Sequence, residues 1–517
     1  MEDAHLWKVV QFSLCTRLIA IVLQVFFNAL IPDHSADAFC PPRLTLSTGW
    51  DFIVEILFGG FSHWDAEHFL FIAEYGYLYE HNFAFFPIFP LTVRLIANTF
   101  LWPLHGLLSL RSSLLVSAVM LNSALHVVSA VILYRLGCIV LQSRRLAYLS
   151  ALFFCLNPAN IFMAAAYSES MFAFLAFSAM WQLERGGVVS SCLLFSFATG
   201  VRSNGIVNAG FLIYSQVKQN IFYSAAVYKH STVLRQICFH TVKSTLTFLT
   251  VLTGTFVILL PFFLFQYYAF LQFCTREMNH QEEIPHPLLE LAASKGYRVA
   301  STTGEVPSWC AEHYPIIYSY VQDVYWNVGF LRYFQLRQIP NCLLALPVTL
   351  LCSWASWYFI SADPWYCLKL GLVKTSKQDK PASGFYSPNV FVYLVHCSCL
   401  LVFGIFHMHV QVLTRFLCSS SPVLYWFCAH LLQKEPLLDE YSCKLSSCTT
   451  RLQADDTSST SAISLIDRSW KNAMSNSITE LFLNWKKCTS TTRCILGYFL
   501  SYWMLGLLLH CNFLPWT

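Results

Sequence analysis

Long apolar segments recur from one end of this 517-residue chain to the other, and they constrain its fold more than any other feature. A helix needs about 20 mostly apolar residues to cross the hydrocarbon core of a bilayer. About eleven segments meet that length, near residues 9–31, 84–104, 113–135, 147–166, 168–184, 190–214, 244–269, 340–361, 389–412, 414–433 and 493–514. Charged side chains make up only 12% of the sequence, against about 25% in soluble proteins. The sequence therefore predicts an all-α polytopic membrane protein with about 8–12 transmembrane helices.

Three polar segments divide this apolar pattern, at residues 32–82, 270–338 and 434–492. Almost no linker separates the other apolar segments, so residues 1–433 are interpreted as one multi-span membrane domain. The Ser/Thr-rich segment 434–492 is expected to form a cytosolic, partly disordered loop, and residues 493–517 a C-terminal transmembrane helix. No internal repeat is visible, which argues against a transporter built from inverted halves.

The basic residues suggest an orientation. The positive-inside rule places the lysine-rich stretch 369–380 in the cytosol, and segment 270–338 then lies on the opposite side. Segment 32–82 shares that side if residues 84–214 form five spans and the N-terminus is cytosolic. The same count puts the Arg144–Arg145 pair on the non-cytosolic side, so the number and orientation of these spans stay open.

The chain has 20 cysteines, but their positions do not indicate a disulfide-rich fold. Most lie inside apolar segments, where a thiol behaves as a small hydrophobic group. No cysteines and histidines have the spacing of a structural zinc site. Cys40, Cys274 and Cys310 lie in polar loops, and we expect a disulfide between Cys274 and Cys310.

The densest group of ionisable side chains lies in Ser62–Phe69. On a helix, Asp65 and His68 share one face, while His63 and Glu67 share another. A capping box made by Ser62 and Asp65 would explain one carboxylate, but not the two histidines and the second acid. We therefore interpret the group as a functional cluster. Its members are His63, Trp64, Asp65, Glu67 and His68.

A second acid, Glu169, lies inside a long apolar stretch. A carboxylate within a span costs about 2.5–3.5 kcal/mol on insertion scales and indicates a functional residue by default. The alternative is a helix end at the membrane interface, where the same carboxylate costs little.

Two arginines are candidates to bind a phosphate. Arg202 has glycines on both sides, and its planar guanidinium suits a phosphate; the alternative is a cytosolic turn in which Arg202 fixes the topology. Arg415 follows His407 and His409 near the end of another apolar segment. The i, i+2 spacing of these histidines points them apart on a helix, which argues against a metal site.

Asp323, Trp326 and Asn327 form a third group, which combines an aromatic ring that can stack on a sugar with an acid and an amide. The alternative is an aromatic belt at the membrane interface.

These motifs resemble the PIG-V family, the mannosyltransferases that add the second mannose during assembly of glycosylphosphatidylinositol (GPI) anchors. The likeness runs from about residue 9 to the end and is loose only in 434–492. The matching stretches are His63–Phe69, Phe85–Pro87, Tyr167–Glu169, Gly200–Gly205, Gln322–Phe330 and Leu507–Thr517.

The resemblance implies a GT-C-type glycosyltransferase of the endoplasmic reticulum membrane, with segments 32–82 and 270–338 and the active site on the lumenal side. Such enzymes transfer mannose from dolichyl phosphate mannose, here in α-1,6 linkage to the mannosylated glucosaminyl-phosphatidylinositol precursor. By position, Asp65 matches the essential lumenal acid of the family, whereas Glu169 is a functional acid by a looser analogy. The implied partners are the two lipids and the bilayer, without nucleic acid; an accessory membrane subunit stays open.

The implied reaction inverts the anomeric carbon in one displacement, which needs a base and stabilisation of the departing phosphate. Asp65 is the expected base, and the other cluster residues, with Glu169 and the group around Trp326, orient it or hold the acceptor. Arg415 is preferred over Arg202 for the donor phosphate, because the expected topology puts it on the lumenal side. No tightly bound cofactor is expected, and a metal is not required. The alternatives are another dolichyl-phosphate-mannose-dependent mannosyltransferase or, from a different class, a polytopic lipid transporter or scramblase.

Overall fold

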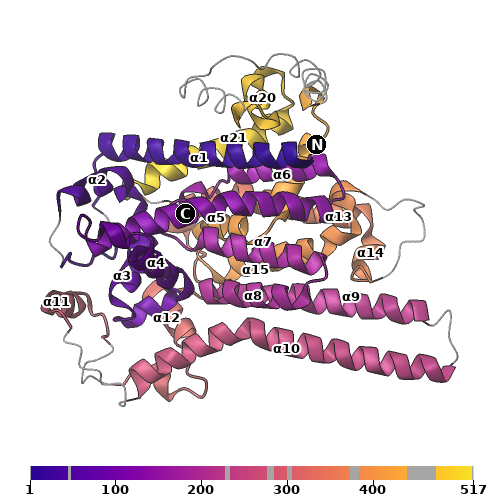
Figure 1. Ribbon diagram of the computed structural model, residues 1–517, viewed down its shortest axis with the longest axis horizontal. Coiled ribbons are helices and arrows are strands. Elements are labelled where there is room, and N and C mark those ends of the chain that lie inside the picture. Colours follow the sequence, from indigo (N-terminus) through magenta and orange to yellow (C-terminus); the bar gives the residue numbers. More distant parts are fainter. Residues whose placement is uncertain are drawn as a thin grey trace.

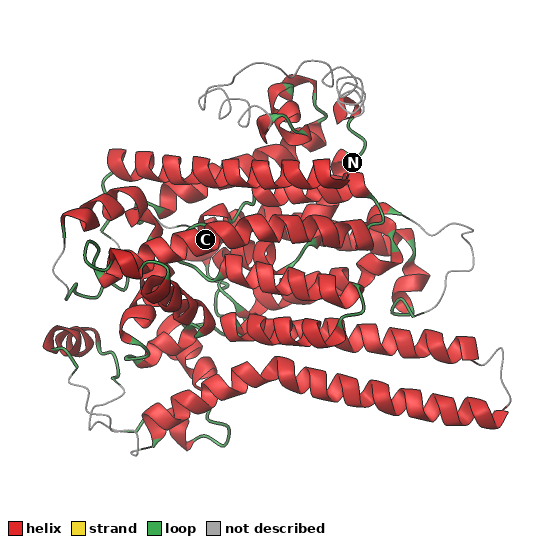
Figure 2. Ribbon diagram, in the orientation of Figure 1, coloured by secondary structure: helices red, strands yellow, loops and turns green. Residues whose placement is uncertain are grey.

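The computed structural model describes residues 2–35, 37–44, 48–227, 233–275, 284–299, 306–372, 383–438, 473–514 and 516. These residues form helices joined by loops (Figure 2). Among them, β-type pairing is limited to one isolated bridge between Tyr79 and Val299. The prediction of an all-α protein is confirmed.

Six of the described helices supply segments that are long and apolar enough to cross a membrane. They are α1 (Glu2–Leu30), α5 (Leu110–Val140), α10 (Val233–Cys274), α13 (Ile339–Ala362), α15 (Phe391–His407) and α21 (Ser490–His510). Shorter helices complete the bundle, namely α6 (Arg144–Cys155), α7 (Glu169–Glu184), α8 (Val188–Val201), α9 (Ala209–Val227), α16 (Leu413–Ser420) and α17 (Val423–Leu432). Helix α7 packs between α5 and α8, and α6 packs against α5 and α17 (Figure 1). The chain is a multi-pass membrane protein, as predicted.

Several further helices gather at one end of the bundle, on the left in Figure 1, which we call the loop end. They are α2 (Gly49–Phe58), α3 (Asp65–Tyr75), α4 (Ile88–Thr99), α11 (His286–Lys295) and α12 (Ile317–Trp326). Segments 32–82 and 270–338 meet here: the Glu80 N–H donates to the carbonyl oxygen of Arg298 at 2.9 Å. Elsewhere, α14 (Pro364–Leu368) follows α13, and α20 (Ser477–Leu483) precedes α21.

The other end of the bundle, which we call the opposite end, contains the N-terminus. His5, near the start of α1, stacks on Tyr148 of α6 with ring centroids 4.6 Å apart. The Arg144–Arg145 pair, which begins α6, therefore lies beside the N-terminus and away from segment 32–82. The expected placement of this pair on the side of segment 32–82 is therefore wrong, although five helices, α5 to α9, still separate that segment from α10.

Two of the expected spans have a different structure, and this difference explains why the Arg144–Arg145 pair was expected at the wrong end. Segment 84–104 contains α4, a 12-residue helix that lies with α2 and α3 at the loop end (Figure 1). Segment 190–214 contains two helices, α8 and α9, joined by a short helical turn at Ser203–Asn208. Gly205 permits this tight reversal, since a Cβ atom there would lie 2.5 Å from the Cα of Thr199.

Prolines interrupt two other expected spans. In segment 147–166, α6 ends at Cys155, shortly before Pro158. In segment 414–433, the helix breaks at Pro422 into α16 and α17. A proline lacks the N–H that a continuous helix needs, so each break brings loop backbone into the bundle.

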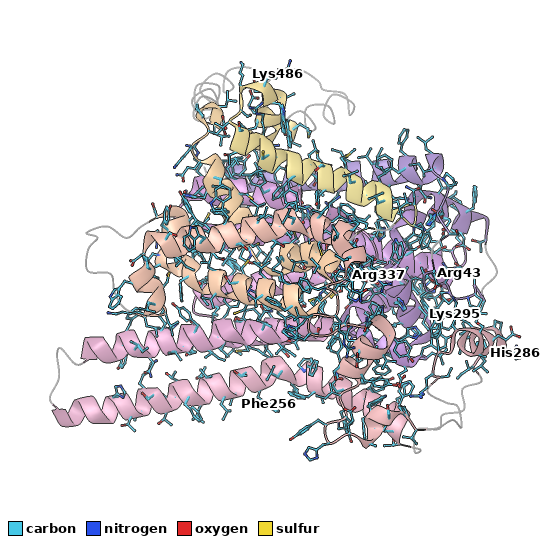
Figure 3. The ribbon with its side chains drawn as sticks, turned by 180° about the vertical axis from the view of Figure 1, so that it is seen from behind. Arg43, Phe256, His286, Lys295, Arg337 and Lys486 are labelled. Carbon is cyan, nitrogen blue, oxygen red and sulfur yellow. A yellow bond between two sulfur atoms is a disulfide. The ribbon has the colours of Figure 1, made fainter. Side chains whose placement is uncertain are left out.

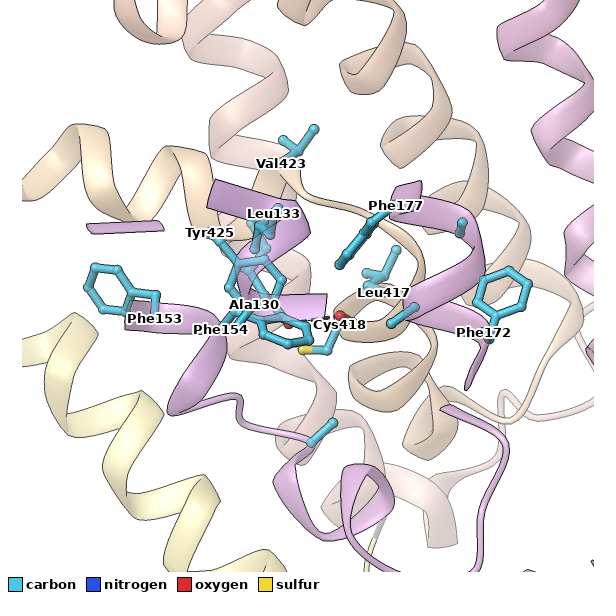
Figure 4. Close-up of a cluster of buried hydrophobic side chains, with 14 of the residues drawn as sticks. Ala130, Leu133, Phe153, Phe154, Phe172, Phe177, Leu417, Cys418, Val423 and Tyr425 are labelled. Carbon is cyan, nitrogen blue, oxygen red and sulfur yellow. Dashed lines mark hydrogen bonds between the residues drawn. The ribbon is translucent and has the colours of Figure 1, made fainter. Parts of the chain in front are cut away.

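Aromatic and aliphatic side chains fill the space between α5, α6, α7 and α17 (Figure 4). The ring of Phe154 lies 5.3 Å from that of Tyr425 and 5.9 Å from that of Phe177, measured between centroids. The Tyr425 hydroxyl donates to the carbonyl oxygen of Cys418 at 2.7 Å. This packing fixes α7 and α16, the two helices that carry Glu169 and Arg415.

Large apolar side chains also cover the outside of the bundle. On α10, Phe256 is 64% exposed (Figure 3), and Leu252 and Phe263 are exposed as well. Apolar residues on both the inside and the outside are expected of helices that lie in lipid.

Cys274, at the end of α10, and Cys310 form a disulfide at the loop end, as predicted. At the opposite end, the buried Glu435 accepts hydrogen bonds from the Thr489 hydroxyl at 2.9 Å and the Thr492 hydroxyl at 2.6 Å. These bonds bring the two ends of segment 434–492 together. The predicted disordered part of that segment falls on residues 439–472, which lie outside the described residues.

Candidate active site

The turn before α3 presents the ionisable cluster at the loop end. Trp64 has φ = 58°, a left-handed conformation that costs a non-glycine residue about 1–3 kcal/mol. Helix α3 then begins at Asp65, and Trp64 caps it without a side-chain hydrogen bond to any described residue. Ser62 instead donates to the carbonyl oxygen of Gly59 at 2.8 Å. The capping box that would have explained Asp65 as a structural residue is therefore not formed.

Asp65 forms an ion pair with Arg415, which extends from the first turn of α16. The Asp65 Oδ2 atom lies 2.8 Å from an Nη atom of Arg415, and the Asp65 side chain is 33% exposed. Burial alone would raise the pKa of Asp65, but the charge and hydrogen bond of Arg415, together with the nearby His68 and Arg202, outweigh burial and leave this pKa below the ordinary value. Asp65 is therefore a carboxylate at neutral pH.

Glu169 begins α7 behind this pair and is fully buried. Its Oε1 atom accepts a short hydrogen bond from Arg202, and the Nε atom of Arg415 lies 3.9 Å from the same oxygen. Acids and arginines thus alternate in the order Asp65, Arg415, Glu169, Arg202, an arrangement that we call the charge chain. The structure therefore brings together two of the four predicted acids, Asp65 and Glu169, and both predicted arginines.

Two aromatic rings support the guanidinium of Arg415. Its Cζ atom lies 5.1 Å from the ring centroid of Phe162 and 5.6 Å from that of Tyr167. Such cation–π contacts restrict the plane of the guanidinium. Arg415 is thus held in place by the rings and by Glu169, as well as by Asp65.

Tyr167 and His510 also belong to the site, although neither was among the predicted site residues. The Tyr167 hydroxyl accepts a hydrogen bond from the Asp65 N–H at 3.1 Å, and it lies 3.4 Å from the Nε2 atom of His510. His510 is the last residue of α21 and is buried. Both residues lie in stretches that carry the family resemblance, Tyr167–Glu169 and Leu507–Thr517, but neither stretch indicated the role of these side chains.

His63 extends from the same turn toward the C-terminal segment. Its Nδ1 atom lies 3.3 Å from the carbonyl oxygen of His510, and its ring stacks on Phe513 with centroids 3.7 Å apart. Its Nε2 atom lies 3.9 Å from a carboxylate oxygen of Asp33. Burial lowers the pKa of His63 despite the nearby Asp33, so this ring links the catalytic turn to the C-terminal segment as a neutral group.

Glu67 lies on α3 but has different partners from Asp65. It accepts a hydrogen bond from Arg43 at 3.0 Å and a shorter one from Arg111. Its side chain is only 7% exposed. These bonds connect α3 with the chain before α2, which contains Arg43, and with the start of α5, which contains Arg111.

His68 occupies a sandwich of aromatic rings. It stacks on Phe39 with centroids 4.3 Å apart and on Phe85 with centroids 4.6 Å apart. Burial lowers the pKa of His68 to about 4, although Asp65 acts in the other direction. The ring is therefore neutral at physiological pH, and it contributes packing close to Asp65.

The third group of predicted residues divides at the end of α12. The Trp326 ring approaches the His68 ring, with centroids 6.4 Å apart. Asp323 instead forms an exposed ion pair with Arg332. Asn327 ends the helix with φ = 51° and donates its N–H to the carbonyl oxygen of Asp323 at 3.0 Å. Trp326 is thus the member of this group that reaches the cluster.

Within the described part of the chain, no three His, Cys, Asp or Glu side chains are grouped so as to hold a metal ion. His407 and His409 face different neighbours: His407 stacks on Phe403, and His409 stacks on Tyr333. The cationic groups beside Asp65 and Glu169 are arginines.

Comparison with known proteins gives a consistent result. The family described as Mannosyltransferase (PIG-V) matches residues 6–517. A Cricetulus griseus protein named GPI alpha-1,6-mannosyltransferase 2 is 53% identical, covering 99% of this chain and 98% of that protein. The human protein of the same name is 52% identical, covering 100% of this chain and 99% of that protein.

More distant matches also exist. The GPI mannosyltransferase 2 of Schizosaccharomyces pombe is 28% identical over 73% of this chain and 67% of that protein. A solved structure, the Archaeoglobus fulgidus oligosaccharyltransferase, aligns with 93% of this chain and 56% of that chain, with a TM-score of 0.39 and 11% identity. The match over nearly the whole chain and the high identity to full-length relatives are decisive: the chain is a glycosyltransferase that belongs to the PIG-V mannosyltransferase family.

Proposed function

We propose that this protein transfers the second mannose, in α-1,6 linkage, from dolichyl phosphate mannose to the mannosylated glucosaminyl-phosphatidylinositol precursor of GPI anchors. The names of the full-length relatives support this linkage and pathway. We further propose a GT-C-type enzyme of the endoplasmic reticulum membrane with a lumenal active site.

The observation that carries this proposal is the contact between Asp65 and Arg415 at the loop end of a membrane bundle. One inverting displacement needs a base beside the acceptor hydroxyl and a cation beside the departing phosphate, on opposite faces of the donor sugar, and the loop end brings one of each to a single site. Asp65 takes the proton from the 6-hydroxyl of the acceptor mannose, and that oxygen forms a bond to C1 of the donor mannose. The bond between C1 and the phosphate oxygen breaks, and its electron pair leaves with dolichyl phosphate.

Arg415 is the preferred ligand of the donor phosphate. Its side chain is about as accessible as that of Arg202, 15% exposed against 17%, but its partner Asp65 is itself open to solvent, whereas the partner of Arg202, Glu169, is fully buried. Arg202 is committed to Glu169 and Ser168, so it supports the charge chain from behind. The two arginines supply positive charge to the departing phosphate, and the proposed reaction requires no metal.

The acceptor sugars are proposed to lie against the half-buried ring of Trp326, beside Phe85 and His68, which stack on each other. Their rings lie within 6.4 Å of one another, between centroids, close to the start of α3. Aromatic faces bind sugars through their apolar C–H surfaces, and Asp323 and Asn327 lie on the adjoining turn.

Two features support a lumenal location of the loop end. Basic residues lie at helix ends of the opposite end: Arg144 and Arg145 begin α6, Arg185 follows α7, and Lys369 follows α14. Such residues favour the cytosol. The Cys274–Cys310 disulfide lies at the loop end, and disulfides persist in the oxidising lumen.

The test is a transfer assay with microsomes from cells that lack the endogenous enzyme and express this chain. Labelled dolichyl phosphate mannose and a one-mannose GPI precursor are supplied, and we expect a two-mannose product that an α-1,6-specific mannosidase shortens. Asp65→Asn is the matched inactive control. Transfer to a different acceptor, or none to this one, would contradict the proposal; restored surface display of GPI-anchored proteins provides a second readout.

A further inference from the structure

The proposed base and the proposed phosphate ligand are bound to each other in the structure. The Asp65 carboxylate lies 2.8 Å from the Arg415 guanidinium. A carboxylate held by an arginine is a poor acceptor for a proton, because protonation would cost the ion pair. Donor binding and proton abstraction therefore both depend on what Arg415 is bonded to.

The partners of Arg415 differ in burial, and this difference indicates which partner a ligand can displace. Three of its partners are buried: the rings of Phe162 and Tyr167 and the carboxylate of Glu169. Asp65 is the exposed partner, and it has no second ion pair among the described residues. Arg415 can thus keep its position when Asp65 departs.

Glu169 is the less suitable partner for displacement. It is fully buried and also accepts a hydrogen bond from Arg202. Its departure from Arg415 would leave a fully buried carboxylate with Arg202 as its one remaining cation, whereas Asp65 can be hydrated at once because its side chain is 33% exposed.

We propose that Arg415 exchanges partners, so that the donor phosphate replaces Asp65 on the guanidinium and the base becomes free only when the donor is bound. This inference rests on the proposed function and adds an order to it. A phosphodiester has a full negative charge and two free oxygens that match the paired N–H groups of arginine. The released Asp65 then accepts the hydroxyl proton in the displacement described above.

The exchange predicts an unusual gain of affinity. If Asp65 competes with the phosphate for Arg415, Asp65→Asn should bind dolichyl phosphate about fivefold more tightly than the wild type, as expected for removing a partly exposed ionic competitor. Asp65→Glu keeps the competing charge and should stay near the wild-type affinity. In an Arg415→Gln background, Asp65→Asn should bring no gain.

The measurement is the dissociation constant of dolichyl phosphate for the full-length protein in lipid nanodiscs. Asp37→Asn is the matched control for a general loss of negative charge, because Asp37 is 92% exposed and pairs with Lys295 at the same end. Asp65→Ser serves as a second neutral variant if Asp65→Asn does not purify as a folded protein.

Unchanged or weaker binding in both neutral Asp65 variants overturns the exchange, as does an equal gain in Asp37→Asn or in the Arg415→Gln background. The transfer assay separates this failure from failure of the proposed function. If the wild type transfers mannose from dolichyl phosphate mannose and Asp65→Asn shows no gain, the exchange alone is wrong. If the wild type neither binds dolichyl phosphate nor transfers mannose, both proposals are wrong.

Discussion

Two carboxylates lie two residues apart at the start of α3, and the structure gives them opposite surroundings. Asp65 has one arginine partner, and a third of its side chain is exposed. Glu67 accepts hydrogen bonds from Arg43 and Arg111, and its side chain is 7% exposed. Both acids belong to one sequence cluster, yet only Asp65 is a member of the charge chain.

The number of ionic partners and the exposure to solvent therefore distinguish a reacting acid from a structural one. A base must exchange a partner for a substrate proton during each reaction cycle. Glu67 cannot do so without leaving two guanidinium groups unpaired, one of them buried. We therefore propose Asp65 as the reacting acid and Glu67 as a residue that stabilises the loop end.

The largest effect is expected for Asp65→Asn, which keeps the shape of the side chain and removes its basicity. We expect the rate of mannose transfer to fall by about 10²–10⁴-fold, the usual contribution of a general base. The measurement is kcat in the microsomal assay, normalised to folded protein. Wild-type transfer by this variant would remove Asp65 from the role of base.

A smaller loss is expected for Tyr167→Phe, which keeps the ring beneath Arg415 but removes the acceptor of the Asp65 N–H. We expect kcat to fall about tenfold with little change in the KM for the donor, since a displaced base affects the chemical step. His510→Ala should have a similar effect, and the double variant should lose less than the two single losses combined. Additive losses would mean that His510 does not act through Tyr167.

Glu67→Gln tests the other side of the comparison. We expect it to lower the free energy of unfolding by about 2 kcal/mol, because it weakens a largely buried ion pair. Transfer per folded molecule should change less than twofold. Thermal unfolding in detergent and the transfer assay measure the two quantities, and a catalytic loss as large as that of Asp65→Asn would break the comparison.

The smallest effect is expected from pH. The pKa of Asp65 lies below its ordinary value, and burial lowers the pKa of His68 to about 4. Asp65 thus remains charged and His68 neutral between about pH 5 and 8, and kcat/KM should show no ionisation of either group in that range. The stability that the Asp65–Arg415 pair contributes is present above the unfolded pKa of the aspartate and is lost as pH falls through the lowered folded pKa. A transition near pH 6.5 that disappears in His68→Gln would contradict this assignment.

Much of the architecture was predictable because apolar length directly reflects a membrane environment. The long helices α1, α5, α10, α13, α15 and α21 fall on predicted segments. The Cys274–Cys310 disulfide was also predictable, because both cysteines lie in a polar loop and not in an apolar segment. Hydropathy failed at α4 and at the α8–α9 turn, since it measures apolar content and cannot detect where a chain reverses.

The candidate site shows the same division. Scarcity of charge identified Asp65, Glu169, Arg202 and Arg415, because an apolar chain places few ionisable residues in its spans. It could not find Tyr167, whose role depends on one hydroxyl and one ring face. It also could not distinguish Asp65 from Glu67, because an arginine partner is recognised by position in space.

The sequence by itself determined that this chain is a helical membrane protein and which family it resembles, since apolar length and local motifs are properties of neighbouring residues. Only the tertiary structure decided that Asp65, Arg415, Glu169 and Arg202 form one alternating chain and that His510 supports Tyr167. Those contacts join residues far apart along the chain. They exist because helix packing brings α3, α7, α16 and α21 to the same end of the bundle, and no local pattern in the sequence encodes that meeting.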